Sequence, residues 1–131
     1  MRCKKESGFS LIELLLVVVI VGVISTIAIP YLRKAIAASE NGNAYATMRV
    51  LISTEISIYA QNNRFGRLDE LNSMSENGLG RISGTSLVRG NFTFVMSPDP
   101  NPSDADLRSG YAITATKPAS AGDEGYLITG D

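Results

Sequence analysis

Hydrophobic and polar positions are distributed unevenly along this chain of 131 residues. A continuous apolar run, LLLVVVIVGVISTIAI, begins at Leu14, and the chain becomes mainly polar after Pro30. The segment Phe9–Ile29 would form a helix of about 31 Å at about 1.5 Å per residue, which is enough to cross a bilayer. The pattern therefore predicts a membrane-spanning helix, followed by a small polar domain that can bury only a limited core.

A second helical pattern runs from Tyr31 to about Asn62. Apolar side chains recur there at steps of three and four residues, which is typical of an amphipathic helix. This predicted face consists of Tyr45, Met48, Ile52, Ile56 and Tyr59. We expect it to pack against a sheet formed by the rest of the chain, after turn residues have ended the helix.

The last part of the chain, residues 63–131, predicts loops and a small sheet. One helical turn is expected at Leu68–Leu71, and the glycine- and serine-rich stretch Ser73–Gly90 is expected to be a loop. Alternating apolar residues predict three strands, at Asn91–Ser97, Gly110–Lys117 and Tyr126–Thr129. The predicted fold class is α+β, with a long N-terminal helix, transmembrane and then amphipathic, packed on a small C-terminal antiparallel β-sheet.

Composition narrows the functions that this chain can have. The net charge is −1, so there is no strong basic footprint for nucleic acid. There is no histidine and Cys3 is the one cysteine, which leaves no disulfide within the chain and almost no ligands for a transition metal. The sequence holds no nucleophile–base pair or phosphate loop. We therefore expect no catalytic residues, no cofactor and no metal.

Three aspartates, Asp99, Asp104 and Asp106, lie in the proline-rich stretch SPDPNPSDADLRSG. Prolines predict a surface loop here. Clustered carboxylate oxygens can bind calcium, but the spacing lacks the glycine and the terminal glutamate of an EF-hand loop. We interpret the stretch as a solvated loop rather than a metal site.

The start of the chain combines positive charge, an apolar run and a carboxylate. Arg2, Lys4 and Lys5 precede the run and favour an N-terminus in the cytoplasm. Glu13 lies at the edge of the run, where a charge near hydrocarbon costs on the order of a few kcal/mol. Two simple interpretations are a signal anchor in which this glutamate is incidental, and a secretory signal peptide cut near residues 35–37.

A third interpretation uses all of these features together. The stretch GFSLIELLLVVVIVGVISTIAIP, behind its short basic leader, resembles the N-terminus of type IV pilins and of the pseudopilins of type II secretion. The resemblance covers residues 1 to about 60. It implies that a prepilin peptidase cuts between Gly8 and Phe9 and N-methylates the new N-terminal Phe9. Glu13 is then the fifth mature residue, as in the family, and Pro30 matches a proline that follows about seventeen residues later.

The resemblance implies a role for Glu13 in assembly. Cleavage exposes the amine of Phe9, and this amine and the carboxylate would each be costly alone in a bilayer or a filament core. In the family the glutamate is thought to pair with the N-terminal amine of a neighbouring subunit, which offsets both costs and sets the register. A contact with the amine of the same chain is the alternative, and it would not specify assembly.

On this interpretation the chain has four parts. These are a cleaved leader at 1–8, a transmembrane and assembly helix at 9–30, an amphipathic helix at 31–62, and an αβ-loop with a sheet at 63–131. Loss of the leader leaves 9 basic residues, 12 acidic residues and no cysteine. Many major pilins close a C-terminal loop with a disulfide, which this chain cannot form.

Two features of the helix leave alternatives open. Pro30 is expected to kink it, and Gly22–Pro30 is either simply kinked or helical in the membrane and looser in a fibre. Tyr31, Tyr45 and Tyr59 are fourteen residues apart and lie near one face. We interpret these tyrosines as packing residues, with an aromatic path through a fibre as the alternative.

The resemblance implies a structural subunit that polymerises through its N-terminal helix into a type IV pilus or related filament, for adhesion, motility or DNA uptake. Expected partners are further copies of the chain, the prepilin peptidase, an inner-membrane assembly platform, minor pilins, and membrane lipid before assembly. The precursor would span the inner membrane once, and the filament would be periplasmic or extracellular. A secretion pseudopilin and an uncleaved membrane-anchored binding domain are the alternatives.

Overall fold

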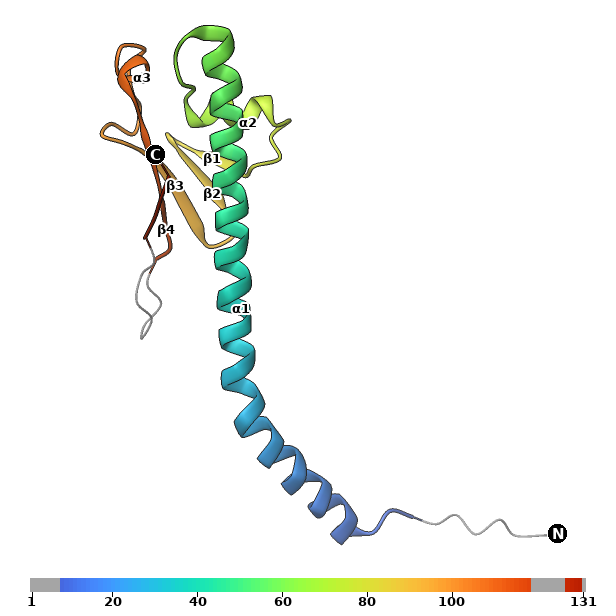
Figure 1. The fold of residues 1–131 in the computed structure, drawn as a ribbon. Coiled ribbons are helices and arrows are strands. Elements are labelled where there is room, and N and C mark those ends of the chain that lie inside the picture. Colours follow the sequence, from blue (N-terminus) through green and yellow to red (C-terminus); the bar gives the residue numbers. More distant parts are fainter. Residues whose placement is uncertain (1–7, 119–126, 131) are drawn as a thin grey trace, which may run out of the picture. The chain divides into compact units, whose positions relative to one another are not determined.

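The computed structural model describes residues 8–118 and 127–130. The chain forms two compact units, residues 1–38 and 39–131, which are considered separately. The helix α1, Leu11–Asn62, begins in the first unit and provides the core helix of the second. Two short helices, α2 at Leu68–Met74 and α3 at Asp106–Ser109, accompany a sheet in the second unit (Figure 1). The predicted α+β class is confirmed.

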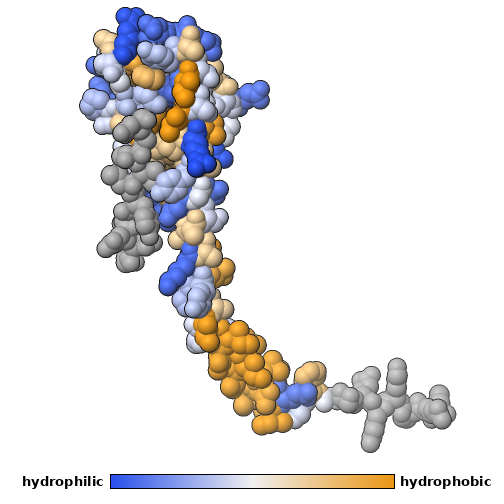
Figure 2. All heavy atoms as spheres, viewed as in Figure 1, coloured by the Kyte–Doolittle hydropathy of each residue, from blue (hydrophilic) through white to orange (hydrophobic). Residues whose placement is uncertain are grey.

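The first unit is a strongly apolar helical segment. Its leucine, isoleucine and valine side chains from Leu11 to Ile29 are roughly half exposed or more, and hydrophobic atoms cover the surface of this part of α1 (Figure 2). By length and composition, α1 could cross a membrane. Because the apolar side chains have no cover within their own unit, they require lipid or another protein surface.

The second unit buries a different face of α1 from the one that the sequence predicted. The buried residues are Ala44, Thr47, Met48, Leu51, Glu55 and Ile58. Tyr45 and Ile56, which we expected in the core, are 58% and 65% exposed. Both faces show steps of three and four residues, and periodicity does not decide which one the sheet covers. Only Met48 is fully buried on the predicted face, so that prediction was wrong by about one position of the helix.

Within the described residues the sheet has five strands in the order β1-β2-β3-β4-β5, and all neighbours are antiparallel. The strands are β1 at Arg81–Ser83, β2 at Ser86–Arg89, β3 at Phe92–Ser97, β4 at Ala112–Thr116 and β5 at Leu127–Gly130. The last three confirm the predicted strands, although Tyr126 lies outside the described residues. β1 and β2 correct our interpretation of 73–90 as a loop.

Two tight turns explain the missed strands. Gly84 and Gly90 have φ values of 61° and 59°, which glycine adopts without strain. Each is the first residue of a two-residue hairpin turn, because Ser83 pairs with Ser86 and Arg89 pairs with Phe92. The glycines that suggested a loop therefore serve as turns between short strands.

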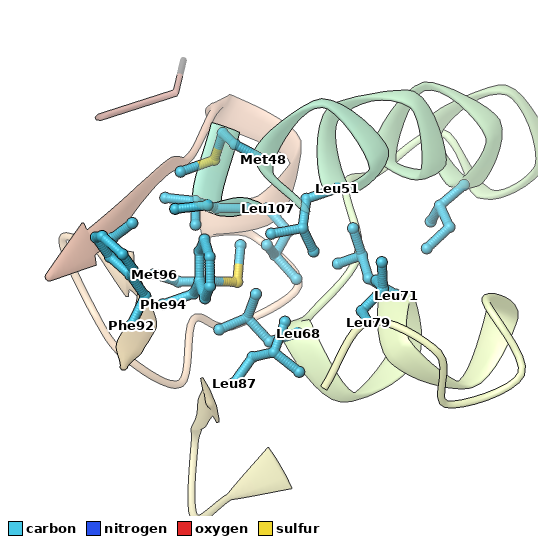
Figure 3. Close-up of a cluster of buried hydrophobic side chains, with 14 residues drawn as sticks. Met48, Leu51, Leu68, Leu71, Leu79, Leu87, Phe92, Phe94, Met96 and Leu107 are labelled. Atoms are coloured by element: carbon cyan, nitrogen blue, oxygen red, sulfur yellow. The ribbon is translucent and has the colours of Figure 1, made fainter. Parts of the chain in front are cut away.

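The core of the second unit lies between α1 and one face of the sheet. β3 alternates buried and half-buried residues, and Phe94 is fully buried at its centre. Met48 and Leu51 of α1 lie toward Phe94 and Leu107 in the close-up (Figure 3). Leu107 belongs to α3, so the stretch that we predicted to be a surface loop also contributes a buried anchor.

Candidate processing and assembly site

The predicted cleavage point lies just before the first turn of α1. Gly8, Phe9 and Ser10 are exposed and have no regular secondary structure, and the helix begins at Leu11. A side chain added at Gly8 would meet no atom within 4 Å. Exposed non-helical backbone is the form that peptidases cut most readily, so this bond has the local structure that processing requires.

Glu13 lies in the first turn of α1. Its backbone N–H donates to the Ser10 carbonyl at 3.0 Å, and a carboxylate here is favoured by the positive end of the helix dipole. Its side chain is exposed among apolar neighbours. Within residues 8–118 and 127–130 this carboxylate makes no ion pair, so the pairing with the Phe9 amine, and which chain supplies that amine, stays a prediction.

The helix runs without a break through Gly22 and Pro30. Pro30 has no N–H to donate to the carbonyl of Thr26. The hydroxyls in the apolar segment are satisfied locally, since Ser25 donates to the Val21 carbonyl and Thr26 to the Val23 carbonyl, both at 2.7 Å. Satisfied polar groups suit a helix in lipid. The kink at Pro30 and the loosening of Gly22–Pro30 in a fibre remain predictions.

The three tyrosines spaced by fourteen residues are all exposed. Only Tyr59 has a ring partner among the described residues: its ring lies 4.8 Å from that of Phe65, which in turn lies 4.7 Å from that of Tyr111. These contacts connect the end of α1 to the residue just before β4. They support a packing role for Tyr59.

A buried carboxyl group that we did not predict lies near this aromatic cluster. Glu55 is fully buried, and its Oε2 accepts a hydrogen bond from the Gly66 N–H at 2.6 Å. Burial raises its pKa to about 7, against the lowering effect of that hydrogen bond. The sequence did contain a signal, because Glu55 interrupts the apolar repeat of Leu51 and Ile58 at a core position.

An ion-pair cluster, formed by Arg64, Arg67, Glu70 and Asp104, was also missed. Arg64 makes a two-pronged contact with Glu70, at 2.9 and 2.8 Å, and this contact lowers the pKa of Glu70 to about 2. Arg67 donates from its backbone to Glu70 at 3.0 Å and from its side chain to Asp104 at 2.8 Å. The cluster therefore links the end of α1 and the start of α2 to the proline-rich stretch.

The three aspartates of that stretch all take part in contacts within the protein. Asp99 accepts the Asn101 N–H at 2.9 Å, and Asp106 accepts both the N–H and the hydroxyl of Ser103, which lowers its pKa. Asp104 pairs with Arg67. Their oxygens serve turns and an ion pair, and among the described residues no group of three acidic or cysteine side chains could hold a metal ion.

Comparison with known proteins gives a family match and a match to a curated relative, and each covers less than half of the chain. Residues 3–29 match the family model of the prokaryotic N-terminal methylation motif. The chain is also 34% identical over 61 residues to the type IV major pilin protein PilA of Myxococcus xanthus (strain DK1622), a match that covers 47% of this chain and 28% of that protein. No solved structure matches.

The matched motif covers the features described above, namely the residues around Gly8, the first turn with Glu13, and the apolar part of α1. Pilin-family proteins are structural subunits and not enzymes. The apolar helix together with the leader motif suggests that the chain is anchored in a membrane. The N-terminal methylation motif and the partial match to a pilin together support membership of the type IV pilin family, as the sequence predicted.

Proposed function

We propose that this chain is a prepilin that is cut after Gly8, methylated on Phe9 and polymerised through α1 into a type IV pilus or related filament. The observation that carries the proposal is the exposed apolar segment of α1, with a carboxylate in its first turn and a non-helical Gly8–Phe9 bond directly before it. A soluble monomer would leave this surface in water, whereas lipid or neighbouring helices would cover it.

The order of events follows from charge. Before cleavage, the carboxylate of Glu13 makes no ion pair among the described residues, and a charge on this apolar surface limits how deeply the first turn can enter lipid. After cleavage, the Phe9 amine supplies a positive charge only four residues away in the sequence. In a filament, that amine pairs with Glu13 of an adjacent subunit and fixes the axial register, because an unpaired charge in an apolar interface is strongly unfavourable.

The partners and the location belong to the same proposal. The peptidase works at the cytoplasmic face, where Arg2, Lys4 and Lys5 hold the leader. The precursor crosses the inner membrane once and remains in the lipid until the assembly platform takes it up. The head, residues 39–131, then lies in the periplasm or outside the cell. Adhesion, motility and DNA uptake are the tasks open to the filament.

The experiment separates processing from assembly with matched substitutions. We expect Gly8→Val to block cleavage, because the peptidase needs a small residue, and Gly8→Ala to preserve it. We expect Glu13→Ala to be cut normally but to yield at least about tenfold less subunit in sheared surface fibres. Glu13→Asp, which keeps the charge, is expected to restore part of the yield. Immunoblots of whole cells and of sheared fibres measure both steps.

The outcomes distinguish the alternatives. Full fibre yield from Glu13→Ala would remove the role of this residue in assembly. If cells with the uncut Gly8→Val chain behave like cells with the natural chain, the result would instead favour an uncleaved, membrane-anchored binding domain. Subunits that assemble only in the periplasm would favour a secretion pseudopilus.

A further inference from the structure

The most unusual group in the second unit is the carboxyl of Glu55. It lies in the middle of the buried face of α1, with none of its surface exposed. Its Oε2 accepts the Gly66 N–H, and its Oε1 is buried without a hydrogen-bond partner among the described residues. A buried ionised carboxylate normally has several donors or a directly bound cation. This site offers one donor, which suits the neutral acid better.

Charged and titratable groups around Glu55 come from three segments. Among the described residues, Arg64, just after α1, is the basic side chain whose charge lowers the pKa of Glu55, and its guanidinium is hydrogen-bonded to both oxygens of Glu70. Glu70 of α2 adds a negative charge, which opposes ionisation of Glu55. Tyr111 lies just before β4. The pKa of Tyr111 is raised to about 12 by burial and by the charge of Glu55. The apolar residues Leu51 and Ile58 lie one turn before and after Glu55 on the same buried face of α1.

The contact with Gly66 leaves little room for adjustment. A Cβ built at Gly66 would lie 2.5 Å from Cδ1 of Ile58 and 3.3 Å from Cδ1 of Leu71. The backbone at Gly66 is therefore pressed against α1 directly over the carboxyl group. Any solvation of Glu55 has to lift the segment Asn63–Gly66 away from the helix.

We propose that Glu55 is a proton-binding site that acts as a pH-sensitive latch between α1 and the segment Asn63–Gly66. With a proton, the carboxyl remains buried under Gly66 and the segment stays closed on the helix. Without it, the carboxylate draws in water and the segment opens. Opening would also disturb the ring of Phe65, which lies between Tyr59 and Tyr111. This inference concerns the head alone and does not depend on filament assembly.

The direction in which pH changes the stability of the head follows from the raised pKa of Glu55. The pKa of Glu55 is raised from 4.5 to about 7 by burial, so the folded head holds a proton that the unfolded chain has lost. Its contribution to stability is fully present below pH 4.5 and is lost as the pH rises through about 7. Because the chain has no histidine, no other side chain with an ordinary pKa titrates between pH 5 and 8.

The test uses the full chain in non-ionic detergent with ¹³C-labelled glutamate side chains. We expect one carboxyl resonance to titrate with a midpoint near 7, and this resonance to be missing in Glu55→Gln. The thermal midpoint of the head, followed by tyrosine near-ultraviolet circular dichroism, should fall from pH 5 to 8 in the natural chain. It should be nearly flat in Glu55→Gln. The matched control Glu76→Gln removes an exposed carboxyl and should leave the slope unchanged.

Three results would overturn the latch. The first is a set of glutamate resonances that all titrate near their ordinary value of about 4.3. The second is a slope between pH 5 and 8 that persists in Glu55→Gln. The third is a slope that disappears in Glu76→Gln. If Glu55→Gln does not fold, the titration of the natural chain still decides, because a midpoint near 7 is required there.

Discussion

Glu13 and Glu55 place carboxyl groups in apolar surroundings in two different ways. Glu13 lies on the exposed apolar surface of α1, and we propose that its partner arrives from outside, as the amine created by cleavage. Glu55 lies in the core, and we propose that it is neutralised by its own proton. In both cases an unpaired charge would be more costly than the arrangement proposed. The chemistry of the two residues is therefore set by what surrounds them.

Gly66 gives a sharp test of packing at the residue scale. Gly66→Ala should lower the free energy of unfolding of the head by about 1–3 kcal/mol, because the new methyl overlaps Ile58 and presses on Leu71. Gly42→Ala is the matched control. A Cβ at this exposed position of α1 meets nothing, and the change should raise stability by about 0.5–1 kcal/mol. Denaturant unfolding at pH 5 measures both, and equal effects would contradict the packing described at Gly66.

At the scale of elements, the ion-pair cluster joins three segments of a chain in which no internal disulfide can form. It connects the end of α1, the first turn of α2 and the proline-rich stretch that carries α3. Arg67 also donates to the Pro102 carbonyl at 3.0 Å, which adds a backbone anchor. Buried Leu107, whose carbonyl accepts the Phe65 N–H at 3.0 Å, joins these contacts in fixing the stretch on the head.

Removing Arg64, which pairs with Glu70 and also lies 3.8 Å from Oδ1 of Asp104, should loosen the stretch. Arg64→Ala should lower the free energy of unfolding by about 1–2 kcal/mol, a modest value because Glu70 keeps access to solvent. Arg108→Ala, at an exposed position of α3 without an ion pair among the described residues, should change it by less than about 0.5 kcal/mol. Hydrogen exchange should speed up over residues 99–110 in the first variant only. Similar exchange in both would show that the cluster is not what holds this stretch.

The cluster also predicts how the stability of the head falls at acid pH. The pKa of Glu70 is lowered from 4.5 to about 2, so its contribution is present above pH 4.5 and is lost as the pH falls through about 2. The raised pKa of Glu55 acts in the opposite direction above pH 4.5. Thermal midpoints across pH 2–8 should therefore peak near pH 5, and Arg64→Ala should flatten the acid side. A peak above pH 7 would contradict the raised pKa of Glu55, and an acid side that Arg64→Ala leaves unchanged would contradict the lowered pKa of Glu70.

Several elements show how far sequence alone could lead. The apolar run, β3 and β4 follow from simple periodicity, and the structure confirms them. The buried face of α1 does not follow from periodicity, because Met48 belongs to two adjacent apolar stripes. Only packing against the sheet decides which stripe is buried. The strands β1 and β2 were missed because they are short, although Gly90-Asn91, which joins β2 to β3, is a recognised turn signal. Contacts such as Arg67 to Asp104 join residues 37 positions apart, and no local pattern reveals them.

The whole molecule consists of two units with different needs. The head, residues 39–131, has its own core between α1 and the sheet. In the described part of the first unit, the apolar side chains of α1 are exposed and form no core, so this surface requires cover from lipid or another protein. This division is what a subunit stored in a membrane and later built into a filament would require.

The most direct test is the mass of the N-terminal peptide, measured on the chain purified from cells that contain a prepilin peptidase. We expect a peptide that begins at Phe9 and carries one methyl group on its amine. The Gly8→Val chain from the same cells should keep Met1 or Arg2 as its first residue. An intact leader on the natural chain in those cells would contradict the central claim that this protein is a prepilin.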